Sequence, residues 1–403
     1  EALGDGYVEA LRGAWPEVPE SSDFVMFWWH HAAGEVAAGR TRRMGLITTN
    51  SLTMVFNRRV VQAALDKGTH LEMAIPDHPW VDGANGAAVR IAMTVLAAGE
   101  GEGVLNHVIS EQSGEHGEVS VTLRGATGLV HADLKVGANV AKASPLRANE
   151  AMSHMGVILV GAGFIVQPGD PLLQLEPGPI KPYMNGRDLT QTSRGVFVID
   201  LAGLTLDEVR SKYPHCYQRL YDTVRVERAV SRDIYLRENW WLFRRTNLQL
   251  RSSLAGLNRY IGTTETAKHR TFSFIDGAVL PDQKIRVITL DDSLSLGVLS
   301  SSLHVQWALA TGGTLEDRPV YNSSICFGTF PFPNEDTGLT PALRDRIAQL
   351  AEQIDAHRKR VLAPESGNTG LTLTGIYNVL AALREGRALT AKEKTQHAQG
   401  LVG

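Results

Sequence analysis

The chain has 403 residues, of which 43% are hydrophobic and 21% charged, and its formal net charge is −3. Such a length allows two or three domains with cores of their own, and the composition is that of an ordinary globular protein. No segment approaches the roughly eighteen consecutive apolar residues of a membrane-spanning helix, and the first residues lack the basic and then apolar pattern of a secretion signal. We therefore expect a cytoplasmic protein that does not bind membranes.

The cysteine content excludes two kinds of stabilisation. Cys216 and Cys326 are the only cysteines, and two are too few for a disulfide framework or a cysteine-based zinc site. We expect a reducing compartment and no bound metal.

The first hundred residues carry the pattern of an open α/β sheet. Apolar residues at helical spacing predict helices at 23–39 and 57–66, and short apolar runs predict strands at 44–49, 71–75 and 87–97. The last two strands, separated by a polar loop, predict an antiparallel pair at the edge of the sheet. The aromatic cluster of the first helix has helical spacing, which predicts core packing and not a metal or cofactor site.

The near-neutral net charge hides two segments of opposite sign. Residues 100–180 contain nine acidic and four basic side chains, whereas residues 210–286 contain fifteen Lys or Arg against seven Asp or Glu. A local excess of positive charge that is rich in Arg is the electrostatic pattern of a domain that neutralises phosphates. The alternative is a basic face that contacts only solvent.

The rest of the chain mixes strands and helices. VGAGF at 160–164 superficially matches a glycine cofactor loop, but it lacks a following helix and a downstream acidic residue, which indicates a turn before a strand. The remaining patterns predict strands at 194–201, 239–243, 259–262 and 272–275, and helices at 206–237, 294–307, 340–362 and 374–384.

Several segments stand out in chain order, namely RMGLITTNSL, FNRRV, AIPDHPW, AAVRIAMTVL, KPYMNGRDL, RSSLAGLNRYIGTTETAKHR, LGVLSSSLHVQW, TFPFP and LTLTGIYNVLAALREG. In this order they resemble one family, the C-terminal half of large single-chain bacterial DNA adenine methyltransferases of type II restriction-modification and phage-defence systems. The resemblance implies an α/β fold: the distal half of a class I, Rossmann-like methyltransferase sheet (1–100), a mostly β connection (101–180), an α+β target-recognition domain (181–335) and a helical C-terminal region (336–403).

The resemblance also implies a function, namely sequence-specific binding of double-stranded DNA and methyl transfer from S-adenosylmethionine to the exocyclic amine of adenine. The family's cofactor glycine motif and its Asn-Pro-Pro-aromatic motif do not occur in this sequence. We expect both upstream of Glu1 or in a separate catalytic subunit, so that this chain holds no catalytic residue and is inactive alone. The alternatives are a DNA-specificity module without chemistry and, less consistent with the basic segment, methylation of RNA or protein.

Two residues are candidates for the pocket that holds the flipped target base. The family places an aromatic residue in the loop before the last strand, where this sequence has Trp80, with His78 as the local alternative. Trp80 could instead cover the sheet as a core aromatic residue. Asn50 follows the end of a strand, where open α/β sheets place ligand contacts, although it could equally cap the next helix.

The candidate DNA contacts lie in the basic segment and just before it. Arg187, in KPYMNGRDL, could bind a phosphate or form a structural bridge to Asp188 or Asp200. Arg side chains read guanine and Asn or Gln read adenine, but most protein contacts to DNA go to phosphates. The other candidates are Arg244, Arg245, Arg251, Lys268, His269 and Arg270. We expect the basic run at 357–360 to be a solvated helix end.

Overall fold

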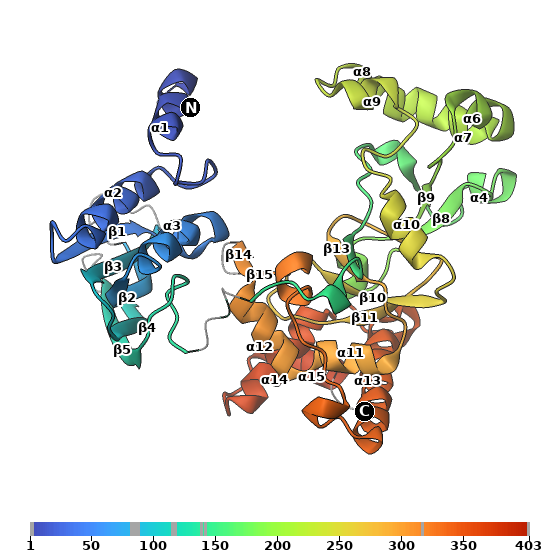
Figure 1. Ribbon diagram of the computed structural model, residues 1–403. Helices are drawn as coiled ribbons and strands as arrows, with labels where there is room; N and C mark the ends of the chain where they lie inside the picture. The colour runs from blue at the N-terminus through green and yellow to red at the C-terminus, as the bar shows by residue number, and fades with distance from the viewer. Residues whose placement is uncertain are drawn as a thin grey trace. The chain divides into compact units, whose positions relative to one another are not determined.

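The computed structural model describes residues 4–80, 89–113, 119–137, 140, 143–315 and 318–400, and it divides into two compact units, Glu1–Ala143 and Ser144–Gly403 (Figure 1). Each unit has its own apolar core. None of the helices in these ranges is long and apolar enough to cross a membrane.

The first unit is a five-stranded sheet with helices, in the strand order β1-β3-β2-β4-β5. Strand β3 is antiparallel to both β1 and β2, and β2 is parallel to β4. The strands are β1 (Arg43–Thr49), β2 (Thr69–Pro79), β3 (Arg90–Ala98), β4 (Gly103–Ser113) and β5 (Val119–Gly128), and the helices are α1 (Asp5–Ala14), α2 (Val25–Ala37), the 3-10 turn η1 (Asn50–Thr53) and α3 (Val55–Leu65).

The antiparallel pair of β2 and β3 forms as predicted, but its place at the edge of the sheet was predicted wrongly. Strand β3 lies between β1 and β2. Its side chains explain this position, because Ala92 and Leu96 on one face and Ile91 and Ala97 on the other are all buried, and a strand buried on both faces belongs in the interior of a sheet. Strands β4 and β5 extend the same sheet, so residues 101–180 do not form a separate unit.

Helix α2 packs on this sheet as its aromatic spacing predicts. Trp29 is fully buried, and its indole Nε1 donates a hydrogen bond to Thr94 Oγ1 of β3 at 3.1 Å. Phe24 and Trp28 lie on the opposite side and remain 44% and 61% exposed. Only part of the aromatic cluster therefore packs in the core.

The second unit contains two four-stranded sheets, β11-β10-β13-β6 and β12-β8-β9-β7, and a hairpin, β14-β15. The chain passes from β12 of one sheet directly to β13 of the other. The strands are β6 (Ser153–Met155), β7 (Ile165–Val166), β8 (Ile180–Met184), β9 (Phe197–Ile199), β10 (Arg259–Thr264), β11 (Ser273–Asp276), β12 (Leu280–Pro281), β13 (Ile285–Ile288), β14 (Gly313–Leu315) and β15 (Arg318–Val320).

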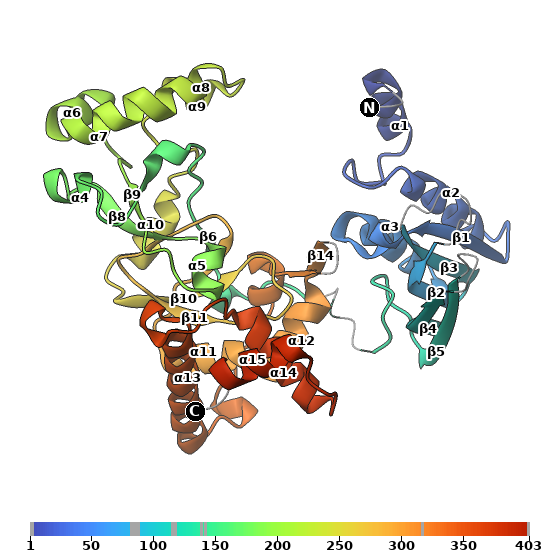
Figure 2. The same cartoon turned by 180° about the vertical axis from the view of Figure 1, so that it is seen from behind.

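Helices of this unit fall into two groups in the chain (Figures 1 and 2). The first group is α4 (Leu172–Leu175), α5 (Gly186–Thr190), α6 (Leu206–Lys212), α7 (Pro214–Leu220), the π-helical turn η5 (Tyr221–Arg225), α8 (Val226–Ala229), α9 (Ile234–Glu238) and α10 (Leu248–Leu254). The second is α11 (Ser293–Ser300), α12 (Ser302–Thr311), α13 (Pro341–Leu362), α14 (Leu373–Arg384) and α15 (Ala391–Gly400).

Four predicted elements of this unit differ in the structure. The helix predicted at 206–237 is interrupted at Tyr213 and again at 230–233, so it forms α6, then α7, η5 and α8 in succession, and then α9. The helix predicted at 294–307 is two helices, because Ser301 is extended (ψ 153°) and its Oγ caps the second by accepting from the backbone N–H of His304 at 3.2 Å. Residues 239–243 are a turn that buries Trp240, not a strand. The polar tail after 384 contains a further helix, α15.

Candidate nucleic-acid interface

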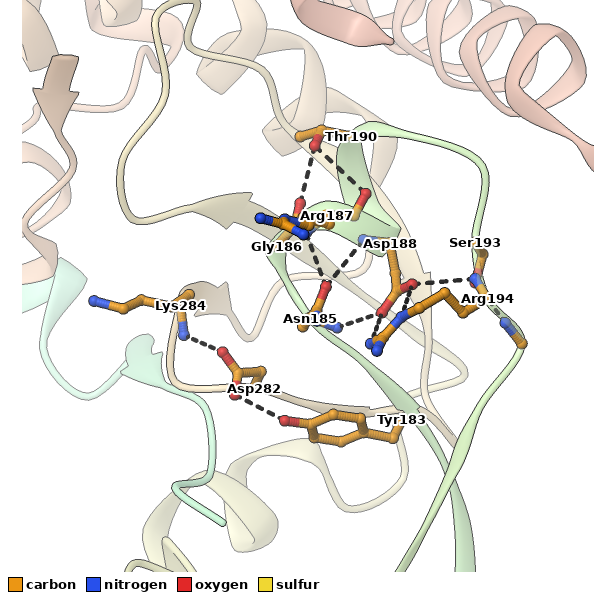
Figure 3. A network of polar contacts seen from close by, with 11 residues as sticks. Tyr183, Asn185, Gly186, Arg187, Asp188, Thr190, Ser193, Arg194, Asp282 and Lys284 are labelled. Atoms are coloured by element: carbon orange, nitrogen blue, oxygen red, sulfur yellow. Dashed lines mark hydrogen bonds and ion pairs between the residues drawn. The ribbon is translucent and has the colours of Figure 1, made fainter. Parts of the chain in front are cut away.

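The segment KPYMNGRDL forms β8 and the short helix α5, joined by a capping box at Asn185. The Asn185 Oδ1 accepts hydrogen bonds from the backbone N–H groups of Arg187 and Asp188, at 2.9 and 3.2 Å. The Asp188 carboxylate in turn accepts from the backbone N–H of Asn185 at 3.0 Å. This reciprocal arrangement fixes the first turn of the helix and therefore the direction in which residue 187 leaves the backbone (Figure 3).

Asp188 is the buried centre of this network, with 5% of its surface exposed. It accepts from the backbone N–H of Arg194 at 3.1 Å and from the guanidinium at 2.9 and 2.7 Å. Burial alone would raise the pKa of Asp188, but the hydrogen bonds from Arg194 and Asn185 outweigh it and hold the pKa below its ordinary value. The carboxylate therefore stays charged and stays hydrogen-bonded to Asn185 and Arg194.

Arg187 takes part in neither of the two structural bridges that its sequence position allowed. Asp188 is bound by Arg194, and Asp200 accepts two hydrogen bonds from Arg251 at 2.6 and 2.9 Å. The exposed side chain of Arg187 has no ion pair or hydrogen bond within the parts of the chain that the structure describes. Of the two roles that the sequence left open, only the external one remains compatible with this geometry.

A second network links this motif to Arg245. The Tyr183 hydroxyl donates to Asp282 Oδ2 at 2.7 Å, and the backbone N–H of Asp282 donates to Met184 O at 2.8 Å. Burial, and then the neighbouring Asp282 carboxylate, raise the pKa of the Tyr183 phenol, so it remains a donor. Asp282 pairs with Val157, and the next residue, Ile158, bridges to Arg245. The segments that carry Arg187 and Arg245 are thus connected to each other through backbone pairing.

The remaining arginines predicted at 244–251 are committed to carboxylates. Arg244 forms an ion pair with Asp233 at 2.7 Å, although half of its side chain is exposed. Arg251 is three-quarters buried against Asp200 and also donates to the backbone carbonyl of Thr246 at 2.7 Å. The prediction that Arg251 contacts DNA does not fit this position, because the guanidinium would have to leave a carboxylate it already binds in two places. Arg245 is the exposed, unpaired member of this set among the described residues.

The cluster Lys268-His269-Arg270 splits into three roles. Lys268 is exposed, and His269 Nε2 lies 2.8 Å from the Asn378 Oδ1. Arg270 is only 8% exposed and donates to the backbone carbonyls of Thr264, Glu265 and Pro319. Burial lowers the pKa of Arg270 to about 10. Arg270 therefore connects β10 to β15, and the predicted DNA contact does not fit a guanidinium whose donors are bound in this way.

Two further arginines show the same structural use of the guanidinium. Arg228 is 2% exposed and donates to five backbone carbonyls, at 159, 160, 239, 240 and 242. Arg358, in the run at 357–360 that was predicted to be solvated, is 7% exposed and donates to Phe272 O at 2.8 Å. Such residues inflate the apparent basic charge of the sequence, because their guanidinium groups are held by backbone carbonyls.

In the first unit, the register of the sheet brings the two base-pocket candidates to one edge. Strands β1 and β2 run parallel to each other on either side of β3, and Thr49 and His78 both pair with Ile91. Asn50 and Trp80, which follow these strands, therefore lie at the same end of the sheet. Trp80 is 47% exposed, which excludes the core alternative. Residues 81–88, the rest of the predicted loop, lie outside the described residues.

Asn50 does not cap the helix that follows it. Its Nδ2 donates to Asp77 Oδ1 of β2 at 3.2 Å. Arg90 of β3 pairs with the same carboxylate at 2.6 Å and with Glu111 of β4 at 2.8 Å. His78 is partly buried, with Nδ1 2.7 Å from Pro79 O. A chain of polar contacts thus runs across this end of the sheet below Trp80.

No group of three or more His, Cys, Asp or Glu within the described ranges is arranged to hold a metal ion. Sequence reasoning missed the organising residues of the second unit, Asn185 and Arg194. The signal for the first was present, since Asn185 and Asp188 stand at the Ncap and N3 spacing of a capping box.

Comparison with known proteins gives one domain match and a likeness to solved structures. Residues 176–334 match the model of the MmeI target recognition domain. Among solved structures, the chain resembles the type IIL restriction-modification enzyme MmeI in complex with DNA, with a TM-score of 0.67, 19% identity, and coverage of 99% of this chain and 53% of the MmeI chain. The type IIG restriction endonuclease BpuSI aligns at a TM-score of 0.30 and 10% identity, over 77% of this chain and 42% of its own.

No curated protein sequence matches the chain. The chain spans about half the length of the MmeI chain. Both units nevertheless lie within the MmeI alignment, and the network around Asp188 lies within the matched domain. Residues 176–334 therefore match the MmeI target recognition domain, and the chain as a whole has the fold of part of the MmeI chain.

Proposed function

We propose that this chain reads the sequence of double-stranded DNA for an adenine methyltransferase of a restriction-modification system. The observation that carries the proposal is the match of residues 176–334 to a target recognition domain. The solved MmeI structure that the chain resembles was determined with DNA. The networks around Asp188 and Asp282 support the proposal, because they hold exposed cations in fixed positions on a rigid backbone.

The DNA contacts that we propose are Arg187 and Arg245. Both are exposed, and neither has a side-chain partner in the described part of the chain. A cation without an internal carboxylate keeps its full charge for a phosphate, whereas one that is already paired must first break its ion pair. Arg244 is proposed only as a peripheral contact, since Asp233 competes for it, and His269 is excluded from the set by its contact with Asn378.

We further propose that the first unit is the distal half of a methyltransferase sheet. The position of antiparallel β3 between the parallel strands β1 and β2 supports this. Asn50 and Trp80 also support it, because they follow the carboxyl ends of β1 and β2, where open α/β sheets bind ligands. In this proposal Trp80 stacks on the extruded adenine, and Asn50 orients it through the Asp77 network.

The segment of this chain that resembles a cofactor loop does not fit S-adenosylmethionine. VGAGF, the sequence closest to a glycine cofactor loop, is a turn before β7, and a side chain at Gly163 would collide with Thr223. Its glycines are thus required by packing against η5. We propose that the methyl donor is bound mainly by sequence outside this chain, in the same polypeptide or in a separate catalytic subunit.

Selection of bound molecules from a pool of randomised duplex DNA tests the proposal directly. We expect the recovered duplexes to share a short sequence, and we expect Arg187→Ala or Arg245→Ala to relax one position or to weaken all duplexes equally. Recovery of unrelated sequences with normal affinity would remove the recognition role. Sequencing of methylated bases in cells that express the complete polypeptide would then identify the modified base and its sequence context together.

A further inference from the structure

A groove of about 980 Å³ lies within the second unit, outside the networks described so far. It is bounded by the loop at 268–270 and by the helices α12, α13 and α14. Most of its wall comes from residues beyond 334, where the match to the target recognition domain ends. The recognition domain alone therefore does not account for it.

The charge of the groove is uniform in sign. No Asp or Glu side chain is among the described residues that line it. Lys268 and Arg384 have no side-chain partner within the described ranges, and Arg360 contacts only His357. The cations of the lining are Lys268, Arg270, Arg358, Arg360 and Arg384. An occupant that bears negative charge would meet no repulsion here.

The groove also has an exposed apolar stripe. Leu350 and Ile354 of α13 and Leu309 of α12 line it and are 39%, 43% and 40% exposed. Leu343, which is 50% exposed, continues the stripe along α13. Positions 343, 350 and 354 are spaced by seven and four residues, which places them on one helix face over about 17 Å, or three turns. The neighbouring face of α13 buries Ala351 and Asp355 in the unit.

A buried donor in the wall lacks an acceptor. Arg358 is 93% buried, and its Nη1 and Nη2 donate to Phe272 O and to the Tyr377 hydroxyl, but its Nε has no partner. This Nε is itself enclosed, so the groove offers an occupant the charge of Arg358 and not this donor. This residue lines the groove.

We propose that the groove binds an amphipathic α-helix of a partner protein, about three turns long, that carries apolar residues on one face and Glu or Asp beside them. The apolar stripe matches the length of such a helix, the cations match its acidic flanks, and docking of an apolar helix face into a groove between helices is a common mode of protein recognition. A DNA backbone satisfies the cations but leaves Leu350 and Ile354 against a charged, hydrated surface. The protein partner therefore fits both features and DNA only one.

Two synthetic peptides of about eighteen residues test the proposal, both with Leu at helical spacing, one with Glu and the other with Lys at the remaining positions. An environment-sensitive dye on Gln353→Cys in the groove reports binding, since both native cysteines are buried. We expect the acidic peptide to bind at least about tenfold more tightly than the basic one. The double variant Arg360→Glu/Arg384→Glu, and separately Ile354→Ser, should each weaken it about tenfold.

Arg210→Glu is the matched control, because Arg210 is an exposed cation of α6 that does not line the groove. Unchanged thermal midpoints would show that the substitutions leave the fold intact. Failure of the acidic peptide to bind, or equal binding of the two peptides, overturns the proposal. Binding of a random-sequence DNA duplex that depends on Arg384 and not on Ile354 also overturns the proposal, because it would identify the groove as a phosphate-binding surface. Sequence selection from duplex pools is an independent readout, so the proposed function and this partner site fail separately.

Discussion

The guanidinium of Arg194 makes two hydrogen bonds to the buried carboxylate of Asp188, from Nε at 2.9 Å and from Nη2 at 2.7 Å. Because Arg194 occupies this carboxylate, Arg187 is left exposed one residue away, at the start of a capped helix. One arginine of the motif is thus structural and the other is available to a ligand. The first prediction concerns Asp188, the carboxylate that the structural arginine, Arg194, binds.

Asp188→Asn should destabilise the second unit by about 1–3 kcal/mol, because the amide cannot accept all of the hydrogen bonds of the carboxylate and leaves buried donors unmet. The pKa of Asp188 is lowered, so its contribution is present above about pH 4 and is lost as the pH falls through the folded-state pKa. Urea unfolding at pH 7 and pH 3 measures this. A difference between wild type and variant that is as large at pH 3 as at pH 7 would contradict the assignment.

Arg187→Ala should weaken DNA binding without lowering stability by more than about 0.5 kcal/mol, because its exposed side chain makes no ion pair or hydrogen bond in the described chain. If it binds a phosphate, the slope of log affinity against log salt should decrease by about one. Arg210→Ala on α6 is the control and should leave the slope unchanged. An Arg187 variant with the wild-type slope and affinity would assign this side chain to solvent.

Arg270→Ala and Lys268→Ala should have opposite effects although the residues are two apart. Removing Arg270 leaves buried carbonyls of Thr264 and Pro319 without donors and opens a cavity beside Tyr321, so we expect a loss of about 2–5 kcal/mol. Lys268→Ala should change stability by less than about 0.5 kcal/mol. It should instead weaken binding of the acidic helix that we propose for the groove. Equal thermal midpoints for the two variants would refute the division.

Trp80→Ala, in an active enzyme that includes the upstream motifs, should reduce methylation much more than binding of cognate duplex, because stacking matters once the base has left the helix. Trp28→Ala is a suitable control, since Trp28 is also an exposed tryptophan of the first unit, at 61%, but lies on α2 away from the ends of the strands. Single-turnover methylation and gel-shift titration provide the two measurements. Normal turnover of the Trp80 variant removes it from the base pocket.

His304 should make the second unit sensitive to acid. It is fully buried, with Nε2 3.0 Å from the Tyr321 hydroxyl, and burial, with a smaller contribution from Arg270, lowers its pKa from 6.5 to about 3. The unfolded state then binds a proton that the folded state does not, so this contribution to stability is complete above about pH 6.5 and is lost progressively down to about pH 3, by at most about 1.4 kcal/mol per pH unit.

His304→Gln should be less stable at pH 7 but should lose less stability between pH 7 and pH 5 than the wild type does. Chemical denaturation at the two pH values gives both free energies of unfolding. Parallel losses in the two proteins would mean that another group carries the acid sensitivity.

The sequence by itself determined the local elements and the family. Apolar periodicity identified β1, α2 and α3, the capping Thr340 and the last periodic residue bounded α13, and the ordered motifs led to the recognition domain that the family match covers. These features depend on side chains within one turn or one strand of each other, so they can be recognised in a single sequence.

Only the tertiary structure decided which cations are free. The sequence alone does not distinguish the three arginines at 187, 251 and 270. Arg187 is exposed, and Arg251 is bound by Asp200, fifty-one residues away. Arg270 is buried and donates to backbone carbonyls of two strands. Likewise, the insertion of β3 between β1 and β2 depends on which strands pair. Long-range pairing fixes how much charge remains for a ligand, because a guanidinium that is already fully hydrogen-bonded inside the protein has little left to offer a phosphate.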